Sequence, residues 1–134
     1  MYYRSTLRSV VLRRYPIKEW FWEVPAGYQK AGQSPEESAR AELREETGGT
    51  ADTWQSIGQY CPNAGFIRSF THIFLATNVV LGQPAHEPEE QIEVYPTPIK
   101  RALKMARNGE ISSSQSALAL LLCEKHLGEF IKLS

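Results

Sequence analysis

Three glutamates near the middle of the sequence could together bind a divalent cation. Glu42, Glu45 and Glu46 are spaced by three and four residues, so in a helix their carboxylates project from one face. Crowded carboxylates repel one another at neutral pH, and two interpretations are open. A glutamate-rich helix face commonly lies in solvent. Alternatively, the carboxylates hold Mg²⁺, which one or two carboxylates bind together with the phosphates of a substrate.

The residues on either side of these glutamates predict a short helix with defined ends. Ser34 is a good N-cap, Pro35 suits the first helical position, and Glu37 completes a Ser-x-x-Glu capping box. Gly48 and Gly49 follow the last turn and favour a left-handed C-terminal cap. We therefore predict a helix between Ser34 and Gly48 that presents the acidic face.

The stretch from Val24 to Gly49 resembles the Nudix box of the Nudix hydrolases, whose pattern is G-x5-E-x7-R-E-U-x-E-E-x-G-U, with U a bulky aliphatic residue. The positions that match are Gly27, Glu42, Leu43, Glu45, Glu46 and Gly48. Three defining positions differ, because Gln33, Ala41 and Gly49 stand where Glu, Arg and an aliphatic residue are usual. The distance between the Pro-Ala-Gly loop and the helix favours the metal interpretation, whereas the three departures bear on activity more than on fold.

The resemblance extends to the ADP-ribose pyrophosphatase branch of that family. The segments that carry it are WEVPAG at 22–27, YCPNAGF at 60–66 and EEQIEV at 89–94, although Ala64 stands where that branch usually has proline. It implies an α/β (α+β) fold, a Nudix-type α/β/α sandwich with a mixed sheet and C-terminal helices. We expect one domain over residues 1–134, short at its N-terminus relative to the family, either naturally or by truncation.

The resemblance also implies an activity and a set of metal ligands. The expected reaction is hydrolysis of the pyrophosphate of ADP-ribose or a related nucleoside diphosphate sugar, giving AMP (or another NMP) and a sugar phosphate, with Mg²⁺ or Mn²⁺. The implied ligands are the Ala26 carbonyl, Glu42, Glu46 and a glutamate from the later acidic loop. For that glutamate we favour Glu90 over Glu89, while a plain solvated loop is a nearly equal alternative.

Catalytic and substrate-binding candidates follow from the same resemblance. Glu45 and Glu90 are the candidates for positioning and deprotonating water. Arg13 and Arg14 lie close to where the branch places an arginine that reads phosphate or ribose, and Trp22 and Tyr28 complete the substrate set. Core packing is the commoner role for a strand tryptophan. The alternative function is a catalytically weak or inactive Nudix module that binds a nucleotide.

Composition limits the other classes of function. The chain has 134 residues, 15 basic and 15 acidic, which suits one domain and argues against a nucleic-acid-binding surface. Cys61 and Cys123 lack zinc-site spacing, so we expect reduced thiols in a cytoplasmic protein. Neither a signal peptide nor a membrane span is predicted, and the branch implies a homodimer.

We predict strands at 6–13, 19–24, 54–60, 69–77 and 92–95, and further helices at 97–107 and 112–127.

Overall fold

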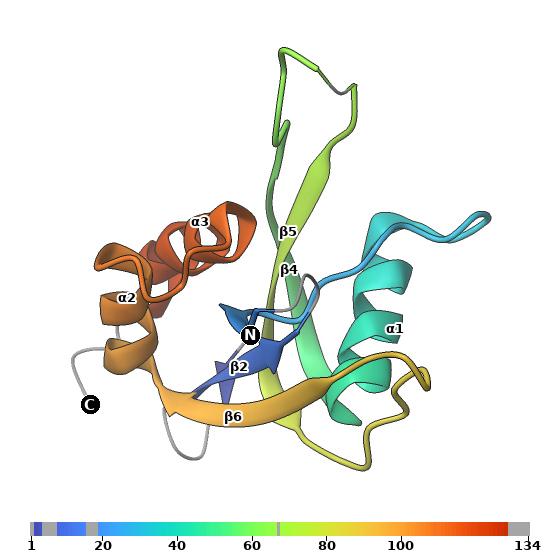
Figure 1. Cartoon of the computed structure of the whole chain (residues 1–134), viewed down its shortest axis with the longest axis horizontal. Coiled ribbons are helices and arrows are strands. Elements are labelled where there is room, and N and C mark those ends of the chain that lie inside the picture. Colours follow the sequence, from blue (N-terminus) through green and yellow to red (C-terminus); the bar gives the residue numbers. More distant parts are fainter. Residues whose placement is uncertain (1, 4–7, 16–18, 67, 129–134) are drawn as a thin grey trace.

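A mixed sheet lies between helix α1 on one side and helices α2 and α3 on the other (Figure 1). The computed structural model describes residues 2–3, 8–15, 19–66 and 68–128. The elements, in chain order, are β1 (Tyr2–Tyr3), β2 (Arg8–Arg14), β3 (Phe21–Glu23), α1 (Pro35–Thr47), β4 (Thr50–Tyr60), β5 (Thr71–Val80), β6 (Ile92–Pro98), α2 (Ile99–Arg107), α3 (Ser114–Glu124) and the 3₁₀ turn η1 (Lys125–Leu127). This arrangement confirms the predicted α/β fold with C-terminal helices.

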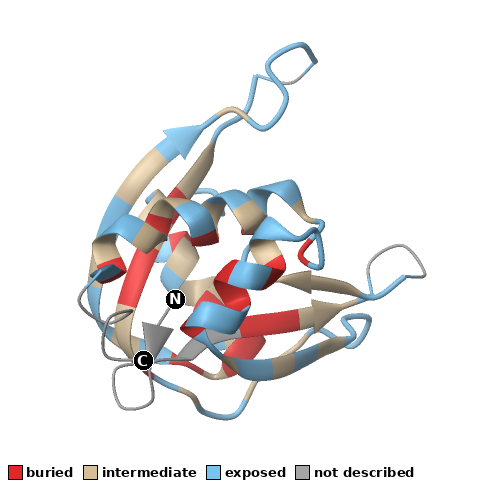
Figure 2. Cartoon of the chain, turned by 90° about the vertical axis from the view of Figure 1, so that its left-hand side faces the viewer, coloured by how far each residue is buried: buried red, intermediate tan, exposed pale blue. Residues whose placement is uncertain are grey.

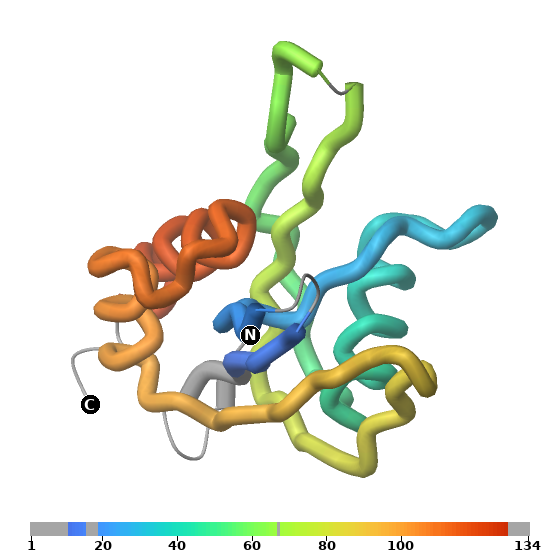
Figure 3. Tube along the Cα trace, in the orientation of Figure 1, coloured from blue at the N-terminus to red at the C-terminus, as the bar shows by residue number. Residues whose placement is uncertain are grey.

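The sheet combines one parallel contact with several antiparallel ones. Its strand order is β3-β2-β1-β5-β4, and β6 pairs with β2 as well. The β1–β5 contact is parallel, whereas β2 runs antiparallel to β1, β3 and β6. The tube in Figure 3 follows the chain from β6 directly into α2 and α3, which cover the sheet face opposite α1. Strand β2 therefore pairs with three other strands of the sheet.

Two adjacent residues of β2 point into two separate cores. Val11 and Leu12 are both fully buried, and successive strand residues face opposite sides of a sheet. Val11 belongs to the larger cluster beneath α2 and α3, and Leu12 to a smaller one that also holds Leu43, Ala76 and Val79. Figure 2 shows these buried segments along the strands and on the inner sides of the helices. Leu43 is thus the residue through which α1 is anchored to the sheet.

The caps of helix α1 are those that the sequence predicts. The Glu37 amide donates to the Ser34 hydroxyl at 3.1 Å, and the Ser34 amide donates to the Glu37 carboxylate at 2.7 Å. Gly48 adopts a left-handed conformation with φ of 66°, and its amide donates to the Arg44 carbonyl at 2.8 Å. The predicted capping box and glycine cap are both confirmed. Residues next to the two ends of α1 therefore determine where the helix begins and ends.

Several strands are longer than predicted because cross-strand pairing extends them. β4 begins at Thr50, immediately after the helix cap, and β5 continues to Val80. β6 continues to Pro98 because all seven of its residues pair with β2, which moves the start of α2 to Ile99. The predicted strand residues 6–7 lie outside the described residues. None of the helices in the described ranges combines the length and the apolar character needed to span a membrane.

Candidate active site

The loop before α1 lies directly against the first glutamate of the acidic face. A Cβ atom added to Gly27 would lie 2.1 Å from Cδ of Glu42 and 2.2 Å from its Oε1. The family pattern places a glycine at this position, and the geometry gives a physical reason, since any side chain would displace the Glu42 carboxylate. Gly27 and Glu42 thereby bring the loop backbone and the helix into one site.

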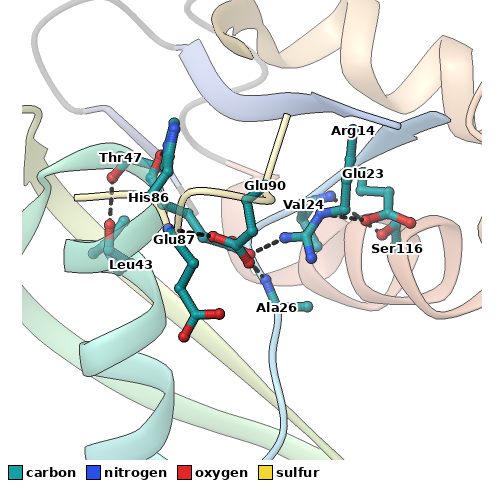
Figure 4. Close-up of polar contacts among 11 residues, drawn as sticks. Arg14, Glu23, Val24, Ala26, Leu43, Thr47, His86, Glu87, Glu90 and Ser116 are labelled. Carbon is teal, nitrogen blue, oxygen red and sulfur yellow. Dashed lines mark hydrogen bonds and ion pairs between the residues drawn. The ribbon is translucent and has the colours of Figure 1, made fainter. Parts of the chain in front are cut away.

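Glu46 is buried beside the same loop and is held by two donors. Its side chain is 2 % exposed, its Oε1 accepts from the Arg14 guanidinium, and its Oε2 accepts from the Ala26 amide at 3.1 Å. Arg14 also approaches the Glu23 carboxylate, with Nε 3.4 Å from Oε2. Figure 4 shows Arg14 and Glu23 on one side of the site and Ala26 below them. The Glu46 carboxylate thus joins β2, the loop and α1.

Glu45 has a different partner, at the edge of the site. The Lys30 ammonium donates to Glu45 Oε1 at 2.6 Å, and both side chains are nearly half exposed. The Lys30 amide donates to the Ser38 hydroxyl at 3.2 Å, which ties the loop to the first turns of α1. The carboxylate of Glu45 raises the pKa of Lys30 through that hydrogen bond. Since the pair is solvent-exposed, it adds little to stability and leaves Glu45 able to exchange partners.

The loop between β5 and β6 is attached to the carbonyl end of α1. The Ala85 amide donates to the Glu45 carbonyl at 2.9 Å, and the Gly82 amide to the Thr47 carbonyl at 3.4 Å. His86 Nε2 lies 2.8 Å from the Glu46 carbonyl oxygen. These carbonyls have no partner within the helix, so the loop takes the place of water there. Figure 4 shows His86 beside Thr47 at the end of α1, with Glu87 and Glu90 in the same loop.

Negative charge accumulates around Glu42. Burial is the largest cause that raises the pKa of this carboxyl, and the charges of Glu45 and Glu90 raise it further. The cations Lys30 and Arg14 act in the opposite direction. In the part of the chain that the structure describes, no hydrogen-bond donor reaches the Glu42 carboxylate. Among the described residues, Glu42 is therefore the member of the acidic face that forms no ion pair with a basic side chain.

The donor chemistry of this cluster suits a hard divalent cation, although its side chains are not already arranged around one. Within the described ranges, no three His, Cys, Asp or Glu side chains converge in a geometry that could hold a metal ion. Glu46 is turned toward Arg14 and Ala26, and Glu45 toward Lys30. Each carboxylate oxygen keeps a second lone pair, and the glycine contact places Glu42 against the loop. Carboxylate and carbonyl oxygens are the ligands that Mg²⁺ prefers.

The four substrate-binding candidates are not gathered in one place. Arg14 lies on the α1 side of β2, with Glu46. Arg13 lies on the opposite face, where its guanidinium stacks over Trp20 at 4.8 Å and over Trp22 at 5.8 Å. Trp22 also packs edge-on against Tyr95, with ring centroids 5.1 Å apart, and against the larger core. Tyr28, which is 95 % exposed, projects into solvent.

At the three positions that depart from the family pattern, the residues or their neighbours make contacts outside the acidic face of α1. The Gln33 side chain accepts from the Ser38 hydroxyl at 3.0 Å and so helps to fix the loop to the start of α1. Ala41 carries no charge, and the neighbouring Arg40 is paired with Glu36 at 2.7 Å and stacked over Trp54 at 4.8 Å. Gly49 is buried against Thr47 and Leu43, and a Cβ there would lie 2.6 Å from the Thr47 hydroxyl oxygen.

The sequence comparison decides the family. A family profile described as the NUDIX domain matches residues 3–114, which is most of the chain. The chain belongs to the NUDIX domain family. Among its curated relatives are an ADP-ribose pyrophosphatase of Bacillus subtilis, 32 % identical over 80 % of this chain and 59 % of the relative, and one of Mycobacterium tuberculosis, 36 % identical over 81 % and 54 %. This NUDIX chain therefore spans just over half the length of these relatives.

Further similarities extend the comparison to another substrate class and to a solved structure. A GDP-mannose pyrophosphatase of Salmonella arizonae is 31 % identical over 88 % of this chain and 68 % of that protein. A solved structure titled as an ADP compounds hydrolase superposes with a TM-score of 0.80 at 19 % identity, covering 92 % of this chain and 68 % of the other. That superposition supports the NUDIX fold.

Three site residues were missed by sequence reasoning. Glu23 could have been assigned, because Trp22 and Val24 both face the larger core and strand alternation then places Glu23 on the α1 side. Lys30 and His86 leave no comparable local signal. Their partners on α1 are 15 and 40 residues away, so only the folded chain reveals them.

Proposed function

We propose that this NUDIX chain hydrolyses the pyrophosphate bond of ADP-ribose or a related nucleoside diphosphate sugar in a divalent-metal-dependent reaction, with AMP or another NMP and a sugar phosphate as products. The observation that carries the proposal is the contact of Glu42 with Gly27, beside Glu45, Glu46 and Glu90. The printed names of the relatives, ADP-ribose and GDP-mannose pyrophosphatases, support this class of substrate.

Each residue of the site has a defined part in this proposal. Glu42, Glu46, Glu90 and the Ala26 carbonyl would hold the cation, Mg²⁺ or Mn²⁺, which when bound neutralises the phosphates and lowers the barrier to attack by water. Glu45 or Glu90 would orient the water and accept its proton as its oxygen attacks phosphorus. The bridging phosphorus–oxygen bond then breaks, and the departing oxygen stays with the second phosphate. Lys30, beside Glu45, can move toward the anionic substrate because its ion pair is exposed.

Turnover by the purified chain tests this function. AMP release from ADP-ribose with MgCl₂ is measured by chromatography, with GDP-mannose, dinucleoside polyphosphates and coenzyme A as competing substrates. Glu42→Gln should lower the rate by roughly 100-fold or more, as expected for loss of one central charged group. Glu36→Gln is the matched control, since Glu36 pairs with Arg40 away from the site. Full turnover by Glu42→Gln would disprove the assignment of Glu42.

A second function, nucleotide binding without fast turnover, is favoured by two observations. Glu45 and Glu46 are already engaged by Lys30 and Arg14, and Ala41 lacks the family's arginine. Calorimetry that shows tight ADP-ribose binding, without hydrolysis at any Mg²⁺ or Mn²⁺ concentration, would favour this binding module. Gain of turnover in the double variant Gln33→Glu, Ala41→Arg would then show that only supporting groups are lost.

We also propose that the chain forms homodimers, as the resemblance to the ADP-ribose pyrophosphatase branch implies. Light scattering after size-exclusion chromatography tests this directly. A mass near 15.2 kDa, that of a single chain, would contradict it.

A further inference from the structure

Arg14 joins two acidic residues that belong to different elements. Its guanidinium forms an ion pair with Glu46 of α1, and its Nε lies 3.4 Å from the Glu23 carboxylate at the end of β3. The Arg14 side chain is 23 % exposed, against 20 % for Glu23 and 2 % for Glu46. A planar guanidinium can serve two carboxylates at once, which the point charge of lysine cannot do equally well. Arg14 is thus a largely buried residue that lines the site and contacts both carboxylates.

The ion pair determines where the Glu46 carboxylate lies. Its two oxygens are divided between Arg14 and the Ala26 amide. Ala26 precedes Gly27, whose Cα hydrogens face the Glu42 carboxylate. A buried carboxylate that lost its cation would be strongly destabilised or would turn away. The position of Glu46 relative to the Ala26–Gly27 backbone therefore depends on Arg14.

Within the described ranges, neither arginine of α1 pairs with the Glu46 carboxylate. Position 41, one residue before Glu42, is alanine. Arg40 pairs with Glu36 and stacks on Trp54, while Arg44 is exposed. The cation that supports the acidic face from behind comes instead from β2, 32 residues away from Glu46 in the sequence.

We propose that Arg14 is a positioning residue that supplies from strand β2 the cation missing from helix position 41, and so holds Glu46 against the Ala26–Gly27 loop for metal binding. This assignment rests on the proposed metal-dependent function of the same site. It differs from the role that the sequence suggests for Arg14, which is direct reading of the substrate. The two roles predict different changes: a positioning role lowers Mn²⁺ affinity and kcat, whereas substrate reading raises KM and leaves Mn²⁺ affinity intact.

The decisive variant is Arg14→Gln, with Arg14→Lys beside it and Arg40→Gln as the matched control. Mn²⁺ affinity is measured without substrate, by calorimetry or by electron paramagnetic resonance, and kcat and KM are measured with ADP-ribose. Loss of an outer-shell partner weakens metal affinity or activity about 10- to 100-fold. Arg14→Gln should therefore weaken Mn²⁺ binding and lower kcat by about that factor, with KM little changed. Arg40→Gln should behave as the parent chain.

Arg14→Lys keeps the test decisive if Arg14→Gln does not fold. Lysine keeps the positive charge but cannot contact Glu23 and Glu46 together. The Mn²⁺ affinity of Arg14→Lys should therefore lie between that of the parent chain and that of Arg14→Gln. If Arg14→Gln does not fold, the Mn²⁺ affinity of Arg14→Lys should still be lower than that of the parent chain. Unchanged or tighter Mn²⁺ binding in both variants would overturn the proposal, since Arg14 would then be only a competing countercharge. A raised KM with intact Mn²⁺ affinity would overturn it in favour of substrate reading. The Mn²⁺ measurement uses no nucleotide, so failure of ADP-ribose as the substrate would be recognised separately.

Discussion

His86 Nε2 donates a hydrogen bond to the backbone carbonyl oxygen of Glu46 across 2.8 Å. The bond lies at the carbonyl end of α1, where the last carbonyl oxygens have no donor within the helix. It is one of three contacts, with those of Gly82 and Ala85, that attach the β5–β6 loop to α1. Because the loop also carries Glu90, this attachment sets the distance between Glu90 and the acidic face of the helix.

Gly82 provides a test of the loop attachment. A Cβ at Gly82 would lie 2.5 Å from the Gly48 carbonyl oxygen, and a backbone atom cannot move aside cheaply. We expect Gly82→Ala to lower the free energy of unfolding by about 1–3 kcal/mol and to lower turnover because Glu90 shifts. Urea denaturation and initial rates measure both effects. Gly128→Ala is the control, since nothing lies near its Cβ position and its φ is −50°; equal effects from both variants would contradict the prediction.

Substitution of Leu43 tests how much the packing of α1 on the sheet contributes to the free energy of unfolding. It is fully buried and packs with Leu12, Ala76 and Val79. Leu43→Ala should cost about 2–5 kcal/mol of unfolding free energy, because it removes buried methyl groups and leaves a cavity. Leu121→Ala serves as control, since its side chain is 38 % exposed and its loss should cost much less. Comparable urea midpoints for the two variants would show that α1 does not depend on this cluster.

The local features of the fold could be predicted from the sequence, whereas the long-range ones could not. The capping box of α1, its glycine cap and the elements from β2 onward follow from residue types at fixed short spacing, whereas β1, which supplies the parallel contact with β5, was not predicted. The length of β6 does not, because Pro96 and Pro98 argue against a strand. They are accommodated because, among the described strands, β6 pairs with β2 alone and so needs no donors on its outer side.

The same distinction holds at the site. The motif spacing identified Glu42, Glu45 and Glu46 as one acidic face, and helical geometry explains why. It treated Arg13 and Arg14 alike, although neighbouring strand residues face opposite sides and only Arg14 reaches Glu46. Deciding between them required knowing that β2 lies between α1 and the α2–α3 pair. That arrangement depends on pairing between distant segments and cannot be read from local pattern.

The two cysteines should differ in reactivity toward a thiol reagent. Cys123 is buried against α2 and the larger core, and burial raises the pKa of its thiol. The reactive thiolate of Cys123 is therefore scarcer at neutral pH than in an exposed cysteine, and its fraction grows only at higher pH. Cys61 is half-buried and should react first with Ellman's reagent. Cys61→Ser should remove the fast phase and leave a slow one that accelerates in urea; a fast phase that persists would contradict the prediction.

Gly27→Ala tests the contact between the loop and the acidic face. The added Cβ would collide with the end of the Glu42 side chain rather than with backbone, so Glu42 can turn aside and the thermal midpoint should change little. Turnover and Mn²⁺ affinity should nevertheless fall at least about tenfold, as for the loss of other groups that orient metal ligands. Gly65→Ala is the control, because the nearest atom to a Cβ added at Gly65 is a side-chain oxygen of Asn63, 3.9 Å away. A fall in thermal stability with full Mn²⁺ affinity would instead mean that Gly27 serves the fold and that the position of Glu42 does not limit metal binding.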